Sequence, residues 1–203
     1  MKNEKIKFSF VIPVAPDRDA EILKSIGKLQ RKDYEVVIEK GINPSENRNR
    51  GMKKAAGEVI VILDDDAILP ENFLDKLESF FLNNPDIDVV GGPQLTPETD
   101  GFFAKISGLA LASKFASFKL SNRYKKGKEN LDADESCITS ASLACKKKVA
   151  KKIVFDKRLF PGEDPKFIDD CKKAGFRIAY TPEIYVWHRR RSSFAKLAKQ
   201  IFS

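Results

Sequence analysis

The chain has 203 residues, 42% of them hydrophobic and 33% charged, which is the length and composition of one globular domain with a substantial core. Its formal net charge of +8 favours an anionic partner, such as a phosphorylated substrate, an acidic membrane surface or a nucleic acid. Three cysteines without CxxC spacing argue against a disulfide framework or a zinc knuckle, and they predict three buried thiols in a reducing compartment.

The first half of the chain alternates strand and helix patterns. We predict strands over 8–14, 34–40, 59–63 and 87–92, and helices over 20–29, 45–56 and 71–82, with Ser45 as the N-cap of the second helix. This order predicts right-handed crossovers and a mainly parallel sheet flanked by helices. In such sheets, ligands bind at the carboxyl ends of the strands.

The second half of the chain is less regular. Residues 102–120 carry apolar side chains over much of a helical surface, whereas residues 124–136 are polar and predict a mobile loop. The remaining predicted elements are a strand over 138–145, a loop and helix over 160–175 that end at Gly175, and one or two strands over 176–188. We expect a single domain made of a nucleotide-binding half, 1–93, and an acceptor-binding and catalytic half, 94–191.

The last residues, 192–203, predict an amphipathic helix, because Phe194, Leu197 and Ile201 fall on one helical face. Such a helix either packs on its own domain, lies on a membrane surface or leads into a membrane region absent from this chain. The chain contains neither a signal-peptide pattern nor a run of about 18 apolar residues. We therefore expect a cytoplasmic protein, either free or at the cytoplasmic face of a membrane.

Three consecutive carboxylates, Asp64, Asp65 and Asp66, directly follow the apolar strand 59–63. Adjacent carboxylates repel one another and are costly to bury unless they are neutralised, so a cation is expected beside them. A strand ending in Asp is also typical of phosphate-hydrolysing ATPases, but the GxxxxGK[ST] loop that they need is absent. A solvated turn that caps the next helix would explain one carboxylate and not three. We interpret the triplet as a site for Mg²⁺ or Mn²⁺ and a substrate diphosphate.

Several motifs in the same order along nearly the whole chain are similar to those of the family-2 inverting glycosyltransferases of the GT-A fold. They are VIPV with Pro13 and Val14, the stretch NRN with Arg48, the triplet DDD, the sequence GED at 162–164, and His188. The resemblance implies a Rossmann-like α/β domain that transfers one sugar from a nucleotide-sugar donor to an acceptor hydroxyl, in glycan or cell-surface polysaccharide synthesis.

The same resemblance implies roles for individual residues. The triplet matches the DxD motif, with Asp64 and Asp66 in its two acidic places. Asp64 and Asp65 would lie beside the donor, and Asp66 would hold Mn²⁺ or Mg²⁺ together with His188. Pro13, Val14 and Arg48 would contact the nucleotide sugar. The usual VDDGS-like stretch is replaced by VIEKGINPS, so Glu39 is the nearest acidic candidate for the base contact.

The GED sequence matches the family's xED motif, which implies that Asp164 is the catalytic base. The neighbouring Glu163 would contact an acceptor hydroxyl. Asp164 also directly precedes Pro165, and this order predicts a helix N-cap as a second role. The QxxRW motif of processive members is missing, so the resemblance favours transfer of a single sugar to a sugar or lipid-linked acceptor.

Two other classes of protein fit parts of the pattern. A sugar-phosphate nucleotidylyltransferase would share the sheet and the metal, but its glycine-rich loop is absent from VIPVAPDRDAE. A nucleic-acid-binding protein would use the positive charge, yet the phenylalanines lie in apolar runs and no binding signature is present. We therefore expect no nucleic-acid partner. Residues 102–120 and 192–203, where Phe and Leu are interspersed with Lys, either pack on the protein itself or contact a membrane surface peripherally, and we expect the membrane contact.

Overall fold

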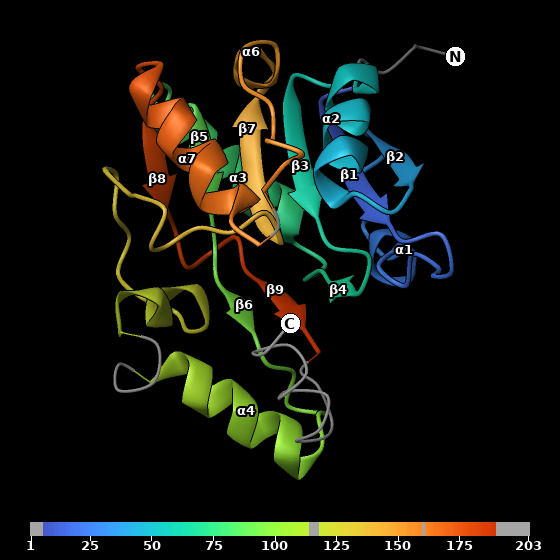
Figure 1. Ribbon diagram of the computed structural model, residues 1–203, viewed down its shortest axis with the longest axis vertical. Helices are drawn as coiled ribbons and strands as arrows, with labels where there is room; N and C mark the ends of the chain where they lie inside the picture. The colour runs from blue at the N-terminus through green and yellow to red at the C-terminus, as the bar shows by residue number, and fades with distance from the viewer. Residues whose placement is uncertain (1–5, 114–117, 160, 190–203) are drawn as a thin grey trace.

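The computed structural model describes residues 6–113, 118–159 and 161–189. At its centre lies a mixed six-stranded sheet with the strand order β2-β1-β3-β7-β5-β8 (Figure 1). Its strands are β1 (Phe8–Val14), β2 (Tyr34–Lys40), β3 (Val59–Leu63), β5 (Val89–Gly91), β7 (Ser142–Lys146) and β8 (Ile178–Tyr180). Strand β1 is parallel to β2 and β3, and β5 is parallel to β8, whereas β7 is antiparallel to both of its neighbours.

Helices cover both faces of this sheet. In the described part of the chain, the helices are α1 (Leu23–Ile26), α2 (Pro44–Lys54), α3 (Phe73–Asn83), α4 (Phe102–Ala112), α6 (Lys147–Ala150) and α7 (Glu163–Lys173), with a 3₁₀ segment η1 (Phe118–Arg123), and α4 lies apart from this sheet. Because side chains alternate along a strand, Phe10 and Ile12 pack with α1 and α3, and Val11 packs with α2 on the other face. The result is an α/β domain with one apolar layer on each side of the sheet.

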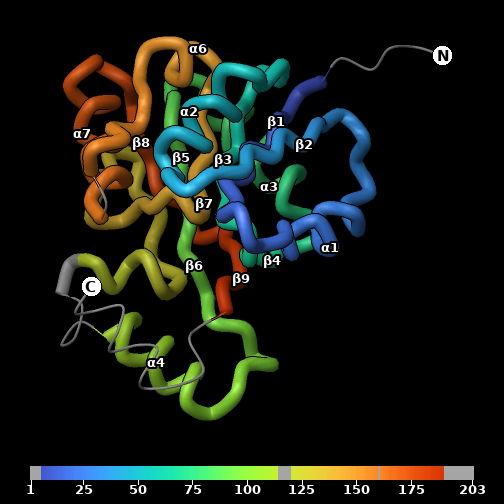
Figure 2. The backbone as a smooth tube through the Cα atoms, turned by 45° about the vertical axis from the view of Figure 1, so that its right-hand side comes forward, coloured from blue at the N-terminus to red at the C-terminus, as the bar shows by residue number. Residues whose placement is uncertain are grey.

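A second, three-stranded sheet consists of β4 (Ala67–Ile68), β9 (Val186–His188) and β6 (Gln94–Leu95). Strand β9 pairs antiparallel with β4, and this register places His188 opposite Ala67. The small sheet therefore brings His188 beside the acidic triplet, which directly precedes Ala67. Figures 1 and 2 both show α4 beyond this small sheet, away from the main one. Gly108 permits the close packing of α4, since an added Cβ would lie 2.1 Å from Thr96 Oγ1.

The structure confirms the α/β class, the strands over 8–14, 34–40 and 59–63, and the burial of all three cysteines. The strand predicted over 87–92 is limited to 89–91, the one predicted over 138–145 is shifted to 142–146, and the helix predicted over 20–29 keeps one turn, 23–26. The polar segment 124–136 contains no helix, and it is linked to β8 by the bridge from Asn130 to Tyr180 and by the Ala133 N–H, which donates to the Ile178 carbonyl.

Two helix predictions were wrong. The second helix is capped by Asn43 and not by Ser45, because extended backbone at Asn43 lets its side chain accept from the Glu46 N–H, and Pro44 already has helical φ. The helix predicted over 102–120 ends at Ala112, where Ser113 turns to extended backbone. Among the described residues, no helix is long and apolar enough to cross a membrane. The helix predicted over 192–203 lies outside the described residues.

Candidate active site

A cavity of about 1080 Å³ opens at the carboxyl ends of β1 and β3 and is lined by residues from both halves of the chain. It collects all but one of the site residues predicted from the sequence. These are Pro13, Val14, Arg48, Asp64, Asp65, Asp66, Glu163, Asp164 and His188. Parallel strands explain the location, because their carboxyl ends meet at one edge of the sheet.

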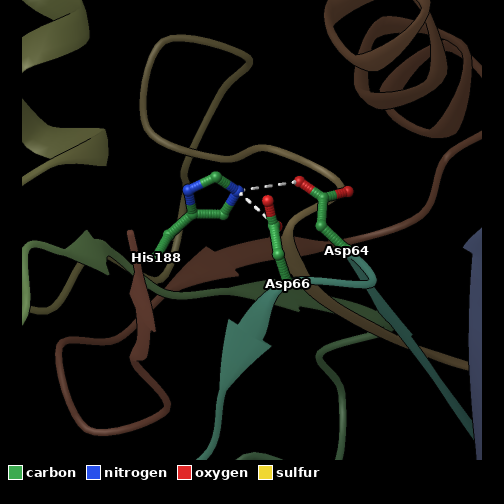
Figure 3. A group of neighbouring side chains, drawn as sticks. All are labelled: Asp64, Asp66 and His188. Carbon is green, nitrogen blue, oxygen red and sulfur yellow. Dashed lines mark ion pairs between the residues drawn. The ribbon is translucent and has the colours of Figure 1, made fainter. Parts of the chain in front are cut away.

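Asp64, Asp66 and His188 line the cavity, and their side chains point toward one another (Figure 3). His188 Nε2 lies 3.0 Å from Asp66 Oδ1 and 3.6 Å from Asp64 Oδ2. Burial disfavours the charged imidazole, but the neighbouring carboxylates of Asp64 and Asp66 outweigh this effect and raise the pKa of His188 to about 10. The aspartates come from the turn after β3 and the histidine from β9, so the pairing of β4 with β9 assembles the group.

This group fits a divalent cation. One ligand atom from each of the three residues can be chosen so that all lie within 4.8 Å of one another. Two carboxylate oxygens and one imidazole nitrogen form a mixed hard and borderline donor set, which Mn²⁺ accepts and Mg²⁺ tolerates. The Nδ1 atom of His188 is buried and has no hydrogen-bond partner among the described residues.

Cationic side chains of the protein itself also neutralise the acidic triplet. Arg18, in the loop after β1, places Nη1 3.3 Å from Asp65 Oδ1 and Nη2 3.1 Å from Asp66 Oδ2. Arg48 Nη2 lies 3.4 Å from Asp64 Oδ1. Burial raises the pKa of Asp65, while the Arg18 charge opposes the rise. The three carboxylates that end β3 are thus tolerated because positive groups surround them.

Asp164 also lines the cavity, and it belongs to the first turn of α7. The Ser140 N–H donates to its Oδ2 at 3.0 Å, and its Oδ1 is buried without a hydrogen-bond partner among the described residues. This oxygen lies 4.0 Å from Arg48 Nη1, a distance that allows an ion pair but not a hydrogen bond. Burial raises the pKa of Asp164, although the Arg48 charge opposes the rise. A buried carboxylate with one unused oxygen and a raised pKa is well suited to accept a proton.

The prediction that Asp164 caps its helix was wrong. Helix α7 begins one residue earlier, at Glu163, after Gly162 adopts a φ of 129° in the left-handed region. Both Glu163 oxygens are engaged: Arg48 Nη1 donates to Oε1 at 3.1 Å, and the Gly162 N–H donates to Oε2 at 3.1 Å. Glu163 is therefore a fixed neighbour of Asp164, with less freedom to take a proton.

Arg48 is buried between the two halves of the site. It contacts Asp64 on one side and Glu163 and Asp164 on the other, and its Nε atom has no partner among the described residues. The flanking asparagines hold the backbone: Asn47 Nδ2 donates to the Gly41 carbonyl, and Asn49 exchanges two hydrogen bonds with the backbone of Phe155. The NRN stretch thus orders the cavity wall and links the triplet to α7.

Glu39 does not line the cavity. It is buried against α2, where Arg50 Nε lies 3.0 Å and Lys54 Nζ 2.5 Å from its carboxylate oxygens. These cations hold the pKa of Glu39 below its usual range although burial opposes them. The sequence departs from the family at this stretch, and the structure gives Glu39 a role in anchoring α2 to β2.

Sequence reasoning missed several residues that line the cavity. Arg18 was detectable in principle, because the loop after the first strand of a parallel sheet lies at the ligand edge. Gln94, Ser107, Tyr124 and Thr139 were not, since they reach the cavity through the small sheet, α4 and irregular segments. Gln94 Nε2 donates to Thr139 Oγ1 and so links β6 to the segment that precedes β7.

The fold and the site define a GT-A-type α/β protein with an acidic centre at the carboxyl ends of its strands. The chain belongs to the family described as glycosyltransferase like family 2, whose model matches residues 21–202. A relative in Methanocaldococcus jannaschii, the uncharacterized glycosyltransferase MJ1057, is 24% identical over 200 residues, covering 95% of this chain and 65% of the relative. The chain thus spans slightly less than two thirds of that protein.

Solved structures share the fold. Residues 1–349 of S. aureus TarS match with a TM-score of 0.66 and 17% identity over 90% of this chain and 60% of that fragment. The same TarS region was solved in complex with UDP-GlcNAc, with a TM-score of 0.66, 17% identity and coverage of 92% and 59%. A197 from STIV matches with a TM-score of 0.55 and 18% identity over 91% of this chain and 95% of A197.

Proposed function

We propose that the chain transfers a single sugar from a nucleotide-sugar donor to an acceptor hydroxyl, with inversion at C1 and with Mn²⁺ or Mg²⁺ bound. One observation carries the proposal: a single cavity holds the Asp64, Asp66 and His188 group and, on another element, the free Oδ1 of Asp164. Family membership and the likeness to a TarS structure that contains UDP-GlcNAc support it. Residues 1–93 would bind the nucleotide, and residues 94–191 would bind the acceptor.

Asp64, Asp66 and His188 would hold the cation, which when bound supplies Lewis-acid stabilisation of the leaving diphosphate. Pro13 and Val14, at the end of β1, form the wall against which the donor would lie. Asp65 keeps Arg18 beside this wall. Arg48, held by three carboxylates, adds fixed positive potential without having to reorganise during the reaction.

Asp164 would act as the general base. The acceptor oxygen forms its bond to C1 while its proton passes to Asp164 Oδ1, and the bond from C1 to the diphosphate oxygen breaks on the opposite face of the ring. Displacement from the opposite face inverts C1. The Ser140 N–H fixes the carboxylate through Oδ2, and Glu163 flanks the acceptor hydroxyl.

Ligand binding and the anomeric configuration of the product test this function. We expect a nucleoside diphosphate and Mn²⁺ together to stabilise the protein, by about 2.7 kcal/mol at a ligand concentration of 100 times Kd, in a thermal-shift screen of nucleotides and nucleotide sugars. NMR should then show a product whose anomeric configuration is opposite to that of the donor. Retained configuration would contradict inversion, and production of pyrophosphate would instead identify a nucleotidylyltransferase.

An exposed apolar face on α4 supports a lipid-linked acceptor at a membrane surface. Phe102 is 82% exposed and Leu109 71% exposed, Ile106 lies between them on the helix, and Lys105 is also exposed. The opposite side of α4 reaches the cavity through Ser107 and Leu111. Helix α4 would thus rest on an anionic bilayer at the cytoplasmic face, with the cavity opening beside the head groups.

Replacing Phe102, Ile106 and Leu109 together with serine should lower binding to vesicles that contain anionic phospholipid by at least about tenfold, since each apolar side chain contributes about 1.5–3 kcal/mol when fully buried. Co-sedimentation at low salt measures the bound fraction. The control changes Leu82 and Val154, which are exposed on other segments, to serine. If the unaltered chain stays in the supernatant, a water-soluble acceptor becomes the better proposal.

A further inference from the structure

Arg18 is placed against the acidic triplet by its own loop. The Arg18 N–H donates to the Ala15 carbonyl at 3.1 Å, and Lys40 Nζ donates to the Arg18 carbonyl at 3.1 Å. The Ile22 N–H donates to the Asp65 carbonyl at 2.9 Å, which ties the far end of the loop to the triplet. The backbone of Arg18 is therefore held, while its side chain remains 50% exposed and free to change rotamer.

The two oxygens of Asp66 are shared between two partners. His188 Nε2 contacts Oδ1 at 3.0 Å, and Arg18 Nη2 contacts Oδ2 at 3.1 Å. His188 belongs to the proposed cation ligands, whereas Arg18, which carries a fixed positive charge, does not. Arg18 therefore occupies an oxygen of the residue to which a divalent cation would bind, and it repels that cation at close range.

We propose that Arg18 is an internal counter-cation that competes with the divalent cation for Asp66 and turns to the donor's diphosphate once that cation is bound. This inference rests on the proposed function. The rotation needs no backbone movement, because Arg18 lines the same cavity as Pro13, Val14 and the triplet. A guanidinium suits the task, since its planar fork can donate two hydrogen bonds to phosphate oxygens.

The consequence is a coupling between the two ligands. While Arg18 lies on Asp66, the cation alone binds weakly, because it must displace a tethered positive charge. When a diphosphate is present, the displaced guanidinium gains a new anionic partner, so each ligand should strengthen the binding of the other. Because of Arg18, the site would bind the cation and the diphosphate together more tightly than it binds either ligand alone.

The test is a titration of the full chain with Mn²⁺, in which electron paramagnetic resonance measures the free Mn²⁺. The titration is done without and with inorganic pyrophosphate, and a protein-free blank corrects for the Mn²⁺ that pyrophosphate binds. We expect Arg18→Gln to bind Mn²⁺ alone about tenfold more tightly than the unaltered chain. Pyrophosphate should lower the Kd for Mn²⁺ in both proteins, but the factor by which it does so should be at least about tenfold smaller in the variant than in the unaltered chain. Arg158→Gln removes the same charge from an exposed side chain outside the cavity lining, and should behave as the unaltered chain.

The outcomes separate this inference from the proposed function. If Arg18→Gln binds Mn²⁺ no more tightly than Arg158→Gln, or if the effect of pyrophosphate is the same in both, the counter-cation role is overturned while the metal site stands. If neither Arg18→Gln nor the unaltered chain binds Mn²⁺ under any condition, the metal-dependent function is overturned and the inference with it. Circular dichroism confirms that each variant is folded.

Discussion

Changing Asp164 to asparagine should lower the rate of sugar transfer at saturating donor by about 10²- to 10⁴-fold, the contribution typical of a general base. The amide has the shape of the carboxylate, and its oxygen can still accept from the Ser140 N–H, so the fold should be retained. Donor affinity should barely change, because proton removal matters in the transition state and not in the ground state. Steady-state kinetics and calorimetric titration with the donor measure the two quantities separately.

The matched control is Asp169→Asn, the same chemical change on the same helix, at a residue that pairs with Lys173 outside the cavity lining. This control should keep its transfer rate within about a factor of two, because a surface substitution away from the cavity changes the stability of the fold little. Near-normal turnover in Asp164→Asn would show that another group removes the proton. Glu163 would then be the next residue to test, although both of its oxygens are already engaged.

Asp66→Asn should weaken Mn²⁺-dependent binding of a nucleoside diphosphate by at least about 10- to 100-fold, the loss that even an outer partner of a metal ligand typically causes. The change removes one charge from the group that Asp64 and His188 complete, and it preserves the shape of the side chain. Calorimetric titration with the diphosphate, in the presence and absence of Mn²⁺, measures the effect. Binding without Mn²⁺ should be much less affected.

Asp75→Asn provides the control, because Asp75 is exposed on α3 and pairs with Arg31, outside the cavity lining. Equal Mn²⁺-dependent affinity in Asp66→Asn and in this control would remove Asp66 from the cation site. Thermal unfolding should be compared as well. Loss of the contacts from Asp66 to Arg18 and His188 alters the ligand-free protein too, and the titrations are valid only if both variants stay folded.

Local patterns in the sequence determine the first half of the fold. The runs FSFVIPV, YEVVIEK and VIVIL are strands at their predicted positions, because apolar and β-branched residues with turn signals on either side leave little alternative. The same patterns place the acidic triplet at the carboxyl end of β3. That three adjacent carboxylates need cations follows from their charge alone.

Helix boundaries were less predictable because they depend on backbone geometry at one residue. Gly162 enters the left-handed region and starts α7 at Glu163, and Asn43 stays extended and caps α2. The two-residue strands β4 and β6 are too short to show any periodicity, and strand β9 has three residues. Their pairing, which carries His188 to Asp66, results from long-range contacts.

The sequence by itself determined which carboxylates, arginines and histidine this protein has for the chemistry, and in which order along the chain. Only the tertiary structure decided which of their atoms remain available. Arg48 and Glu163 are 115 residues apart, yet their 3.1 Å contact engages Glu163, whereas Asp164 Oδ1 accepts no hydrogen bond from the described residues. Glu39 is taken by Arg50 and Lys54, and Arg18 is drawn to Asp66. Charge follows from residue type, but its partner follows from packing, because electrostatic attraction in the interior acts only between the groups that the fold brings within a few ångströms.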